Sequence, residues 1–459
     1  MSTSGPLPVL GVSTDDIVSS LRAMPPAQGA TLTSAVHCVL DTVAVAIAAA
    51  DETVVQAVLR DALEEGGHSR SSIWGHAASL TPAQAARVNG TAAHALDFDD
   101  VSSLMEGHPS APLLPAVLAM AESRGASGHQ LLDAFVVGFE AEALVGRLVS
   151  PTHYADGFHS TATVGALGAA VGASRLLDLP HEAWLDALGI AASRAAGLKS
   201  MFGTMTKSLQ VGAAAESGLR ATLLAARGVD SDKDVLASSQ GFRTTLSDES
   251  GVPERWGWRR SAVNDVLFKF HAACYLTHSA VEGARALARE GLSPTEVSSI
   301  VLLVPPGHLA VCNIESPRTP LEGKFSLRFT TAMALTGRTL GEEDFTSDNL
   351  GAPDVVSLME RTTVRARDTN TIRSSQVTVT LTDGTTRVVE VDVNRPTPED
   401  ELALREESLV AKFRSLVTPR LGAAATEELL LAVLDLPRSP DLTRLTQALT
   451  NAPAPPPTS

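Results

Sequence analysis

Aromatic residues are scarce in this sequence. Phe, Trp and Tyr make up 4% of its 459 residues, whereas hydrophobic residues as a whole make up 44%. A hydrophobic fraction built mainly from aliphatic and small side chains favours closely packed helices over a β-sandwich, which needs large side chains in its core. A chain of this length also exceeds what one hydrophobic core usually supports. The composition therefore predicts a helix-dominated protein with two structural domains.

Cysteine is equally rare. The three cysteines, Cys38, Cys274 and Cys312, have no C-x-x-C spacing, which argues against a disulfide framework and against a cysteine-based zinc site. This usage indicates a reducing, cytoplasmic compartment. The first residues contain no basic segment followed by an apolar run, and Asp15 and Asp16 interrupt them early, so we expect no secretory signal.

Long apolar runs and basic runs are missing as well. The longest apolar stretches, Thr42–Ala50 and Thr161–Ser174, are shorter than a membrane span needs, so we expect no membrane helix. The net charge of −16, without a run of Lys and Arg long enough to form a basic stripe, argues against nucleic acid as a partner. A small anionic substrate remains compatible with this charge, because a few lysines in a cleft set the local potential.

Sequence motifs for nucleotide and metal cofactors are absent. There is no G-x-x-x-x-G-K-S/T, no H-E-x-x-H, no G-x-S-x-G and no strand followed by G-x-G-x-x-G, the patterns that bind phosphates, zinc or dinucleotides or carry a nucleophilic serine. Gly165, Gly168 and Gly172 lie within a helical pattern, where glycine indicates close helix packing rather than phosphate binding. We therefore expect neither a cofactor nor a metal.

The order of periodic segments predicts a mostly α fold with a smaller α+β domain. Apolar residues recur at helical intervals from Ser13 to about Leu267, with helix starts near Thr81 and at Ser127, which indicates a helical bundle over residues 1–266. A β-branched run covers residues 297–307. A strand–turn–strand pattern covers residues 375–393 with its turn at 382–385, and a helix at 327–336 lies between, so we assign residues 267–397 to an α+β lid domain.

Helical periodicity returns over residues 399–416 and 426–434. We expect residues 398–459 to rejoin the first bundle, which makes the helical domain discontinuous. The proline-rich end, from about residue 452, is predicted to be a disordered tail.

The first dense polar cluster contains three carboxylates in four residues. Asp97, Asp99 and Asp100 follow His94 and precede His108. Carboxylates this close repel one another, so they need exposure, pairing or a task such as orienting a cation or a histidine. A helix end with solvated acids and a metal site built from the acids and a histidine are both open readings, although no recognised metal-ligand spacing is present.

A second cluster surrounds His159. Ser160 or Thr161 can cap the helix that follows, which would place His159 beside the helix N-terminus. The helix dipole lowers the pKa of a histidine there and favours a neutral imidazole that can accept a proton. A histidine that only bonds to the loop backbone is the alternative.

Two further segments contain lysines in apolar surroundings. Lys207 has no acid nearby in sequence, so it either extends its amine to solvent or holds an anionic ligand. Lys269, His271 and Cys274 lie at the predicted domain junction, where ligand clefts commonly form, so they are candidate substrate-binding residues. Cys274 taken alone is typical of a small buried hydrophobic residue.

These four clusters, in this order, resemble the MmgE/PrpD family, which includes 2-methylcitrate dehydratase, cis-aconitate decarboxylase and iminodisuccinate epimerase. The segments that carry the resemblance are AHALDFDD at 93–100 with HPS at 108–110, GFHSTATVG at 157–165, TKSLQVG at 206–212 and KFHAAC at 269–274. The resemblance runs from about residue 30 to 400. It implies a helical domain packed on a smaller lid domain, an active site between them, a homodimer, and no metal or organic cofactor.

The resemblance also implies roles for single residues. Asp97, His108, His159, Lys207 and Lys269 match the family's active-site acid, two histidines and two lysines. Lys207 and Lys269 would then bind substrate carboxylates, and His159 would be the general base or acid. His108 would assist or orient, and Asp97 would fix a histidine tautomer. The substrate implied is a small di- or tricarboxylate.

Two positions depart from the decarboxylase branch of the family. Cys274 stands where that branch has a further histidine, and Phe329 stands where it has a tyrosine, while His271 could occupy part of the vacated space. These departures favour a lyase that dehydrates a citrate-like acid over a cis-aconitate decarboxylase. An epimerase of an amino- or imino-dicarboxylate such as iminodisuccinate is the alternative. A catalytically silent helical dimer used for binding is a further one.

Overall fold

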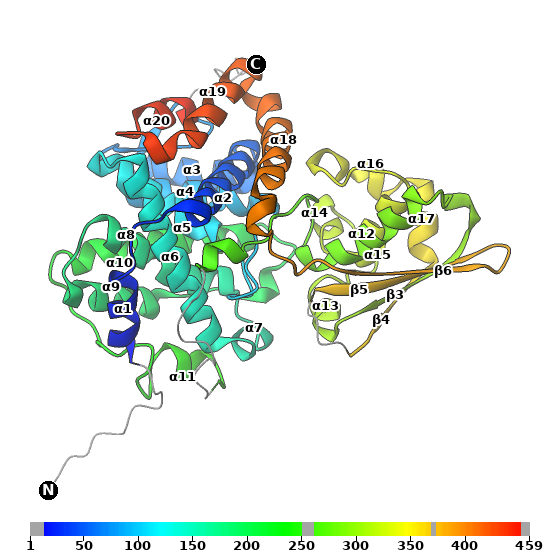
Figure 1. The fold of residues 1–459 in the computed structure, drawn as a ribbon, viewed down its shortest axis with the longest axis horizontal. Coiled ribbons are helices and arrows are strands. Elements are labelled where there is room, and N and C mark those ends of the chain that lie inside the picture. The colour runs from blue at the N-terminus through cyan, green and yellow to red at the C-terminus, as the bar shows by residue number, and fades with distance from the viewer. Residues whose placement is uncertain (1–12, 250–260, 369–372, 451–459) are drawn as a thin grey trace, which may run out of the picture.

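The computed structural model describes residues 13–249, 261–368 and 373–450, and it divides into a larger helical part and a smaller part with a sheet (Figure 1). The larger part contains α1 (Thr14–Arg22), α2 (Gly29–Ala48), α3 (Thr53–Glu65), α4 (Pro82–Ala95), α5 (Ser110–Arg124), α6 (Gly128–Val149), α7 (Thr152–Ala155), α8 (Ser160–Leu176), α9 (His181–Arg194), α10 (Thr206–Ala225), α11 (Phe242–Leu246), α18 (Leu402–Leu421), α19 (Ala423–Leu434) and α20 (Thr443–Thr450). Two short strands, β1 (Ser71–Ser72) and β2 (Ser79–Leu80), pair antiparallel beside them.

Local sequence signals start several of these helices. Thr81 caps α4 and Ser127 caps α6, each in a reciprocal capping box, and Pro82 occupies the first turn of α4; these features satisfy backbone N–H groups that a helix start leaves unpaired. The helix starts predicted at both places are confirmed. The prediction of helix almost throughout to residue 267 is wrong beyond Ala225. Only α11 and a short 3-10 turn follow among the described residues there.

The centre of the bundle is built from small residues. Gly165 and Gly168 lie on α8, and a Cβ atom would lie 2.4 Å from Cγ of Pro112 at the first position and 2.2 Å from Cγ of Glu142 at the second. Only glycine permits so close an approach of α8 to α5 and α6. The predicted packing role of these glycines is confirmed.

Helix α2 is long and apolar enough to cross a membrane, but 78% of its apolar window is buried inside the protein. It packs against α4 and α18. Burial of this kind is typical of a core helix, and it accounts for the apolar sequence.

The smaller part consists of a four-stranded sheet covered by helices. The strand order is β4 (Thr362–Ala366), β3 (Val297–Val304), β5 (Ser374–Leu381), β6 (Thr386–Asp392), with β3 and β4 parallel and the other pairs antiparallel. Helices α12 (Tyr275–Arg289) and α15 (Leu327–Leu335) pack together, and α12 lies on β5 and β6. The remaining helices here are α13 (Pro306–Val311), α14 (Pro320–Gly323), α16 (Ser347–Leu350) and α17 (Pro353–Glu360).

The predicted hairpin is confirmed. Asp383 accepts a hydrogen bond from Thr385 N at 2.8 Å, and Gly384 adopts φ +87°, a left-handed conformation that glycine adopts without strain. The strand predicted after residue 297 and the helix predicted after residue 327 are confirmed as β3 and α15. Strand β4 was not predicted, because its burial alternates only weakly and its parallel pairing with β3 joins residues about 62 positions apart.

The chain leaves the sheet after β6 and returns to the bundle, where α18 packs along α2 and α19 (Figure 1). The helices predicted at 399–416 and 426–434 are confirmed as α18 and α19. The predicted disordered tail, beginning near residue 452, lies outside the described residues.

Glu140 on α6 ties the segment at residues 261–262 to the bundle, and it makes stability sensitive to pH. It is buried and accepts hydrogen bonds from Ser261 Oγ and Ala262 N. Burial raises the pKa of the Glu140 carboxyl from 4.5 to about 7. The folded state therefore keeps a proton that the unfolded chain loses, and stability falls as pH rises from 4.5 through about 7, by at most about 1.4 kcal/mol for each pH unit.

Glu140→Gln should weaken this loss, because an amide does not titrate. Between about pH 5 and pH 8 we expect the melting temperature of the variant to fall less than that of the parent, measured by calorimetry. Glu64→Gln, at an exposed position, is the control and should follow the parent. Parallel pH profiles for the Glu140→Gln protein and the parent would contradict the assignment.

Candidate active site

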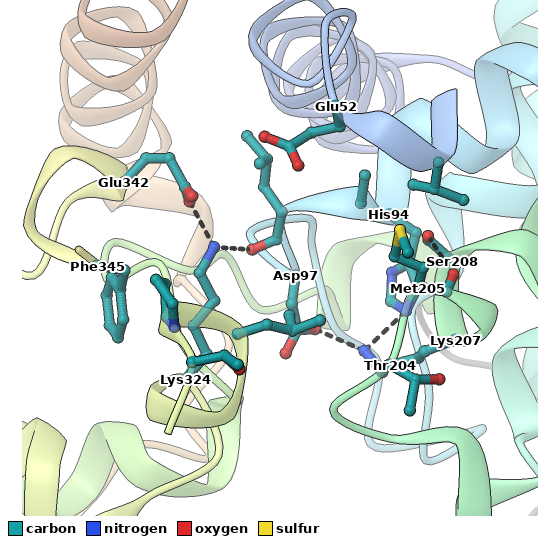
Figure 2. A pocket seen from close by; sticks show the side chains of 16 residues that line it. Glu52, His94, Asp97, Thr204, Met205, Lys207, Ser208, Lys324, Glu342 and Phe345 are labelled. Carbon is teal, nitrogen blue, oxygen red and sulfur yellow. Dashed lines mark hydrogen bonds and ion pairs between the residues drawn. The ribbon is translucent and has the colours of Figure 1, made fainter. Parts of the chain in front are cut away.

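A cleft of about 300 Å³ lies between the two parts of the structure (Figure 2). Its titratable side chains come from both: Glu52, His94, Asp97 and Lys207 from the helical part, and Lys324 and Glu342 from the smaller part. A polar, partly enclosed cleft at a junction of two domains is a common location for a small-molecule site.

Asp97 holds two lysines at one oxygen. Its Oδ1 accepts from Lys207 Nζ at 2.8 Å and from Lys269 Nζ at 3.0 Å, and Lys269 also donates to the Asp97 carbonyl at 2.7 Å. Burial opposes ionisation of Asp97, yet Lys207 and Lys269 hold the pKa of its carboxyl well below the usual value. Asp97 follows α4 with φ +52°, a strained conformation for a residue other than glycine that is often kept at functional sites.

Lys207 lies in the first turn of α10 and links Asp97 to His94. Its Nζ is 2.8 Å from His94 Nε2, and His94 Nδ1 lies 2.8 Å from Asp99 Oδ2. An ammonium can only donate and an ionised carboxylate can only accept, so His94 carries its proton on Nδ1. The rings of Phe202 and Phe325 lie 5.3 and 5.4 Å from Lys207 Nζ, which favours a cation at that position.

His108 lies just before α5, beside the same acids. Its Nδ1 is 3.3 Å from Asp99 Oδ2, its Nε2 is 3.7 Å from Asp97 Oδ1, and its ring meets the His94 ring edge-on at 4.6 Å. Burial lowers the pKa of His108 to about 4. The ring is therefore neutral at about pH 7. Asp97 lies closer to the two lysines than to this histidine, so the structure does not place it as the group that fixes a histidine tautomer.

His159 is itself the residue before the first turn of α8. The expectation that Ser160 or Thr161 caps this helix is wrong, because the helix begins at Ser160 and no side chain caps it. His159 Nδ1 lies 2.9 Å from Gln210 Oε1, and its Nε2 is buried without a hydrogen-bond partner in the described part of the chain. Burial, followed by the charge of Lys207, holds the pKa of His159 well below its usual value. The result is a neutral imidazole beside a lysine.

Comparison with known proteins agrees with this arrangement. Residues 16–254 match the MmgE/PrpD N-terminal domain, and residues 271–436 match the MmgE/PrpD C-terminal domain. The chain belongs to the MmgE/PrpD family. The fold and the resemblance expected from the four sequence segments are thereby confirmed.

Several curated relatives within this family are cis-aconitate decarboxylases. The human protein is 31% identical over 84% of this chain and 83% of its own length, and the mouse protein is 29% identical over 90% and 87%. The protein of Aspergillus terreus is 28% identical over 95% and 93%. The chain is accordingly an enzyme of the lyase class.

Of the predicted site residues of this MmgE/PrpD protein, Asp97 and Lys207 line the cleft, whereas His108 and His159 are not among its lining residues. Lys269 is completely buried, with its Nζ directed at Asp97. His271 Nε2 bonds to Glu282 Oε1 at 2.6 Å, on α12. Cys274 is 9% exposed and its thiol contacts that of Cys312. Phe329 is buried and lies behind Phe345 of the cleft, with 6.1 Å between the rings. Roles in substrate binding for Lys269, His271 and Cys274 stay predictions.

Sequence reasoning missed Lys324, the cation that the smaller part of this MmgE/PrpD fold contributes to the cleft. Its Nζ donates to Leu96 O at 2.7 Å and to Glu342 Oε2 at 2.6 Å. Figure 2 shows Lys324 and Lys207 on opposite sides of the cleft. Sequence reasoning also missed Lys412, which donates to Asp41 and to the carbonyls of Phe98 and Lys269 and so braces the site from α18. Neither lysine belongs to a motif or spacing that would single it out in the sequence.

His94, Asp97, Asp99 and His108 offer ligand atoms within 4.8 Å of one another, a grouping that could hold a metal ion. Several of their atoms already have partners, because Asp97 Oδ1 binds two ammonium groups and His94 uses both ring nitrogens, whereas Asp97 Oδ2 and His108 Nδ1 have no hydrogen-bond partner in the described part of the chain. A divalent ion would face the charge of Lys207 and Lys269 at short range.

We therefore expect activity to be unaffected by chelators and by added nicotinamide, flavin or pyridoxal cofactors. Turnover would be measured before and after exhaustive dialysis against EDTA. Loss of activity that one divalent ion restores would instead establish the four residues as metal ligands.

Proposed function

We propose that this chain is a cofactor-independent lyase that dehydrates a small citrate-like di- or tricarboxylate. The observation that carries the proposal is the combination of a neutral base with a cation, since His159 Nε2 has no partner among the described residues and the charge of Lys207, which lines the cleft, acts on the same imidazole. Removal of a proton next to a carboxylate requires these two groups, one to take the proton and one to stabilise the charge that develops.

In the proposed reaction, Lys207 binds a carboxylate of the substrate and His159 Nε2 takes the proton from the carbon beside it. The carbon–carbon double bond forms as the carbon–oxygen bond of the neighbouring hydroxyl breaks. The hydroxyl leaves as water with a proton from an ammonium or imidazolium group of the site. Lys269 strengthens the local positive charge, and Asp97 orients both lysines. His108, which lies beside Asp97, assists. Lys324 is available for a second carboxylate at the other side of the cleft.

Decarboxylation of cis-aconitate is the second candidate, and the relatives from human, mouse and Aspergillus terreus favour it. The resemblance, however, places Cys274 and Phe329 where the decarboxylase branch has a histidine and a tyrosine. These features support dehydration as the first choice.

A panel of acids in D₂O separates the candidates. With citrate-like hydroxy acids we expect a product with an absorbing double bond and release of water. Release of CO₂ from cis-aconitate would establish the decarboxylase instead. Solvent deuterium entering the α-position of an amino-dicarboxylate, with neither alkene nor CO₂, would establish an epimerase. Absence of all three, with binding retained, would leave the silent binding dimer.

We also propose a homodimer. Leu198, which precedes α10, and Leu209 on α10 expose 52% and 37% of their surface, and exposed apolar side chains are common at interfaces. Light scattering should give twice 47.8 kDa. Leu209→Asp should weaken the association, and a parent protein of single-chain mass would exclude the dimer.

A further inference from the structure

Gln210 lies on α10, one turn after Lys207, and contacts both His159 and the backbone of Leu198. Its Oε1 is 2.9 Å from His159 Nδ1 and accepts from Leu198 N at 3.2 Å, while its Nε2 donates to Leu198 O at 3.4 Å. A backbone N–H can only donate and a carbonyl can only accept. Leu198 therefore determines which end of the Gln210 amide faces His159, and that end is the oxygen.

The fixed amide decides where the proton of His159 lies. An amide oxygen has no hydrogen to give, so His159 Nδ1 must donate, and in the neutral ring the lone pair is then on Nε2. This is the nitrogen that is buried without a partner in the described residues. The His159 ring lies 5.1 Å from the ring of Phe202 and 5.7 Å from the ring of His94. Both Phe202 and His94 also contact the Lys207 ammonium.

The loop that holds Gln210 also holds His159. His159 N donates to Gly197 O at 3.0 Å. A Cβ atom on Gly197 would lie 3.1 Å from Gln210 Oε1, 3.2 Å from His159 Cβ and 2.8 Å from Ala162 Cβ. Residues 197–198 thus fit between the histidine and the glutamine with no room for a side chain at residue 197, which restricts the orientation of the imidazole.

We propose that Gln210 is a positioning residue that keeps His159 in the Nδ1-protonated tautomer, so that the lone pair available to accept a proton is on Nε2. The catalytic part of this inference rests on the proposed role of His159 as base, whereas the tautomer does not. Because the amide is uncharged, it selects the tautomer without adding the negative charge that would favour a protonated ring.

The test uses the full chain with ¹⁵N-labelled histidine, and the His159 signals are identified by their loss in His159→Gln. In the parent, long-range ¹H–¹⁵N correlation should show Nδ1 protonated and Nε2 unprotonated. In Gln210→Met, which removes the acceptor, we expect a mixture of tautomers and a fall in kcat of about tenfold or more, with KM within a few-fold. Ser217→Ala, further along α10 and half-buried, should match the parent in both readouts.

Gln210→Glu keeps an acceptor oxygen but adds a charge. The carboxylate stabilises the protonated ring and raises the pKa of His159, so kcat/KM should fall off at higher pH on the acid side than in the parent. A parent ring protonated on Nε2, or a tautomer unchanged in Gln210→Met, would overturn the proposal. A tautomer that shifts without any change in kcat would confirm the positioning by Gln210 and overturn the role of His159 as base.

Discussion

Lys207→Ala should lower the affinity for a carboxylate substrate by about 10- to 100-fold or more. Lys207 is only 6% exposed, its Nζ lines the cleft, and it is fixed by Asp97 and His94 on one side and by two phenylalanine rings on the other. A hydrogen bond between charged groups contributes about 1.5–3 kcal/mol, or about 10- to 100-fold in affinity, and its loss leaves a bound carboxylate without compensation.

The variant should still fold, because Asp97 keeps its bonds to Lys269 when Lys207 is removed. Titration calorimetry with citrate and cis-aconitate measures the affinity, and circular dichroism checks the fold. Lys233→Ala is the matched control, since Lys233 is an exposed lysine paired with Asp186. Binding and turnover equal to the parent in a folded Lys207→Ala protein would exclude Lys207 from the site.

His159→Gln should lower kcat by roughly 10²- to 10⁴-fold while KM stays within a few-fold, because a general base contributes about that much and the lysines that bind the substrate remain. Glutamine is close in size to the ring and can still bond within the pocket, but it accepts no proton from carbon. The pH profile of the parent provides a second test of His159 as the base. His159 has a lowered pKa and must be neutral to act, so kcat/KM should persist into mildly acidic solution and fall only as the ring is protonated.

Steady-state kinetics on the acid that the panel identifies measures both constants. His181→Gln, which removes a histidine from a half-exposed pair with Asp15, is the control and should leave kcat unchanged. In D₂O, the His159→Gln protein should also lose exchange of the α-proton. Exchange that continues at the parental rate would show that another group removes this proton, and His108, a neutral histidine beside Asp97 and Asp99, would then be tested in the same way.

Helix and strand formation followed from short-range patterns. The capping boxes at Thr81 and Ser127 and the turn at Asp383 and Gly384 consist of groups within a few residues of one another, so the sequence alone predicts them. The prediction failed where a local pattern is compatible with more than one conformation. The segment after Ala225 has helical intervals but little helix, and the hydroxyls at Ser160 and Thr161 do not cap α8.

The sequence by itself determined the helical class with a smaller α+β part, and it identified Asp97, His108, His159, Lys207 and Lys269 as candidates. Only the tertiary structure decided what each one faces. His159 meets Gln210 across 51 residues and Lys207 meets His94 across 113. Lys269 and His271 are neighbours in sequence, yet one is directed at Asp97 and the other at Glu282.

Lys324 could not be predicted from the sequence for the same reason, since it lines the cleft through a hydrogen bond to Leu96, 228 residues away. The physical reason is that caps and turns are closed by neighbouring backbone groups, whereas the protonation and direction of a buried side chain depend on whichever charges and amides the folded chain brings within about 3 Å. Residue types and their spacing along the chain do not specify that environment.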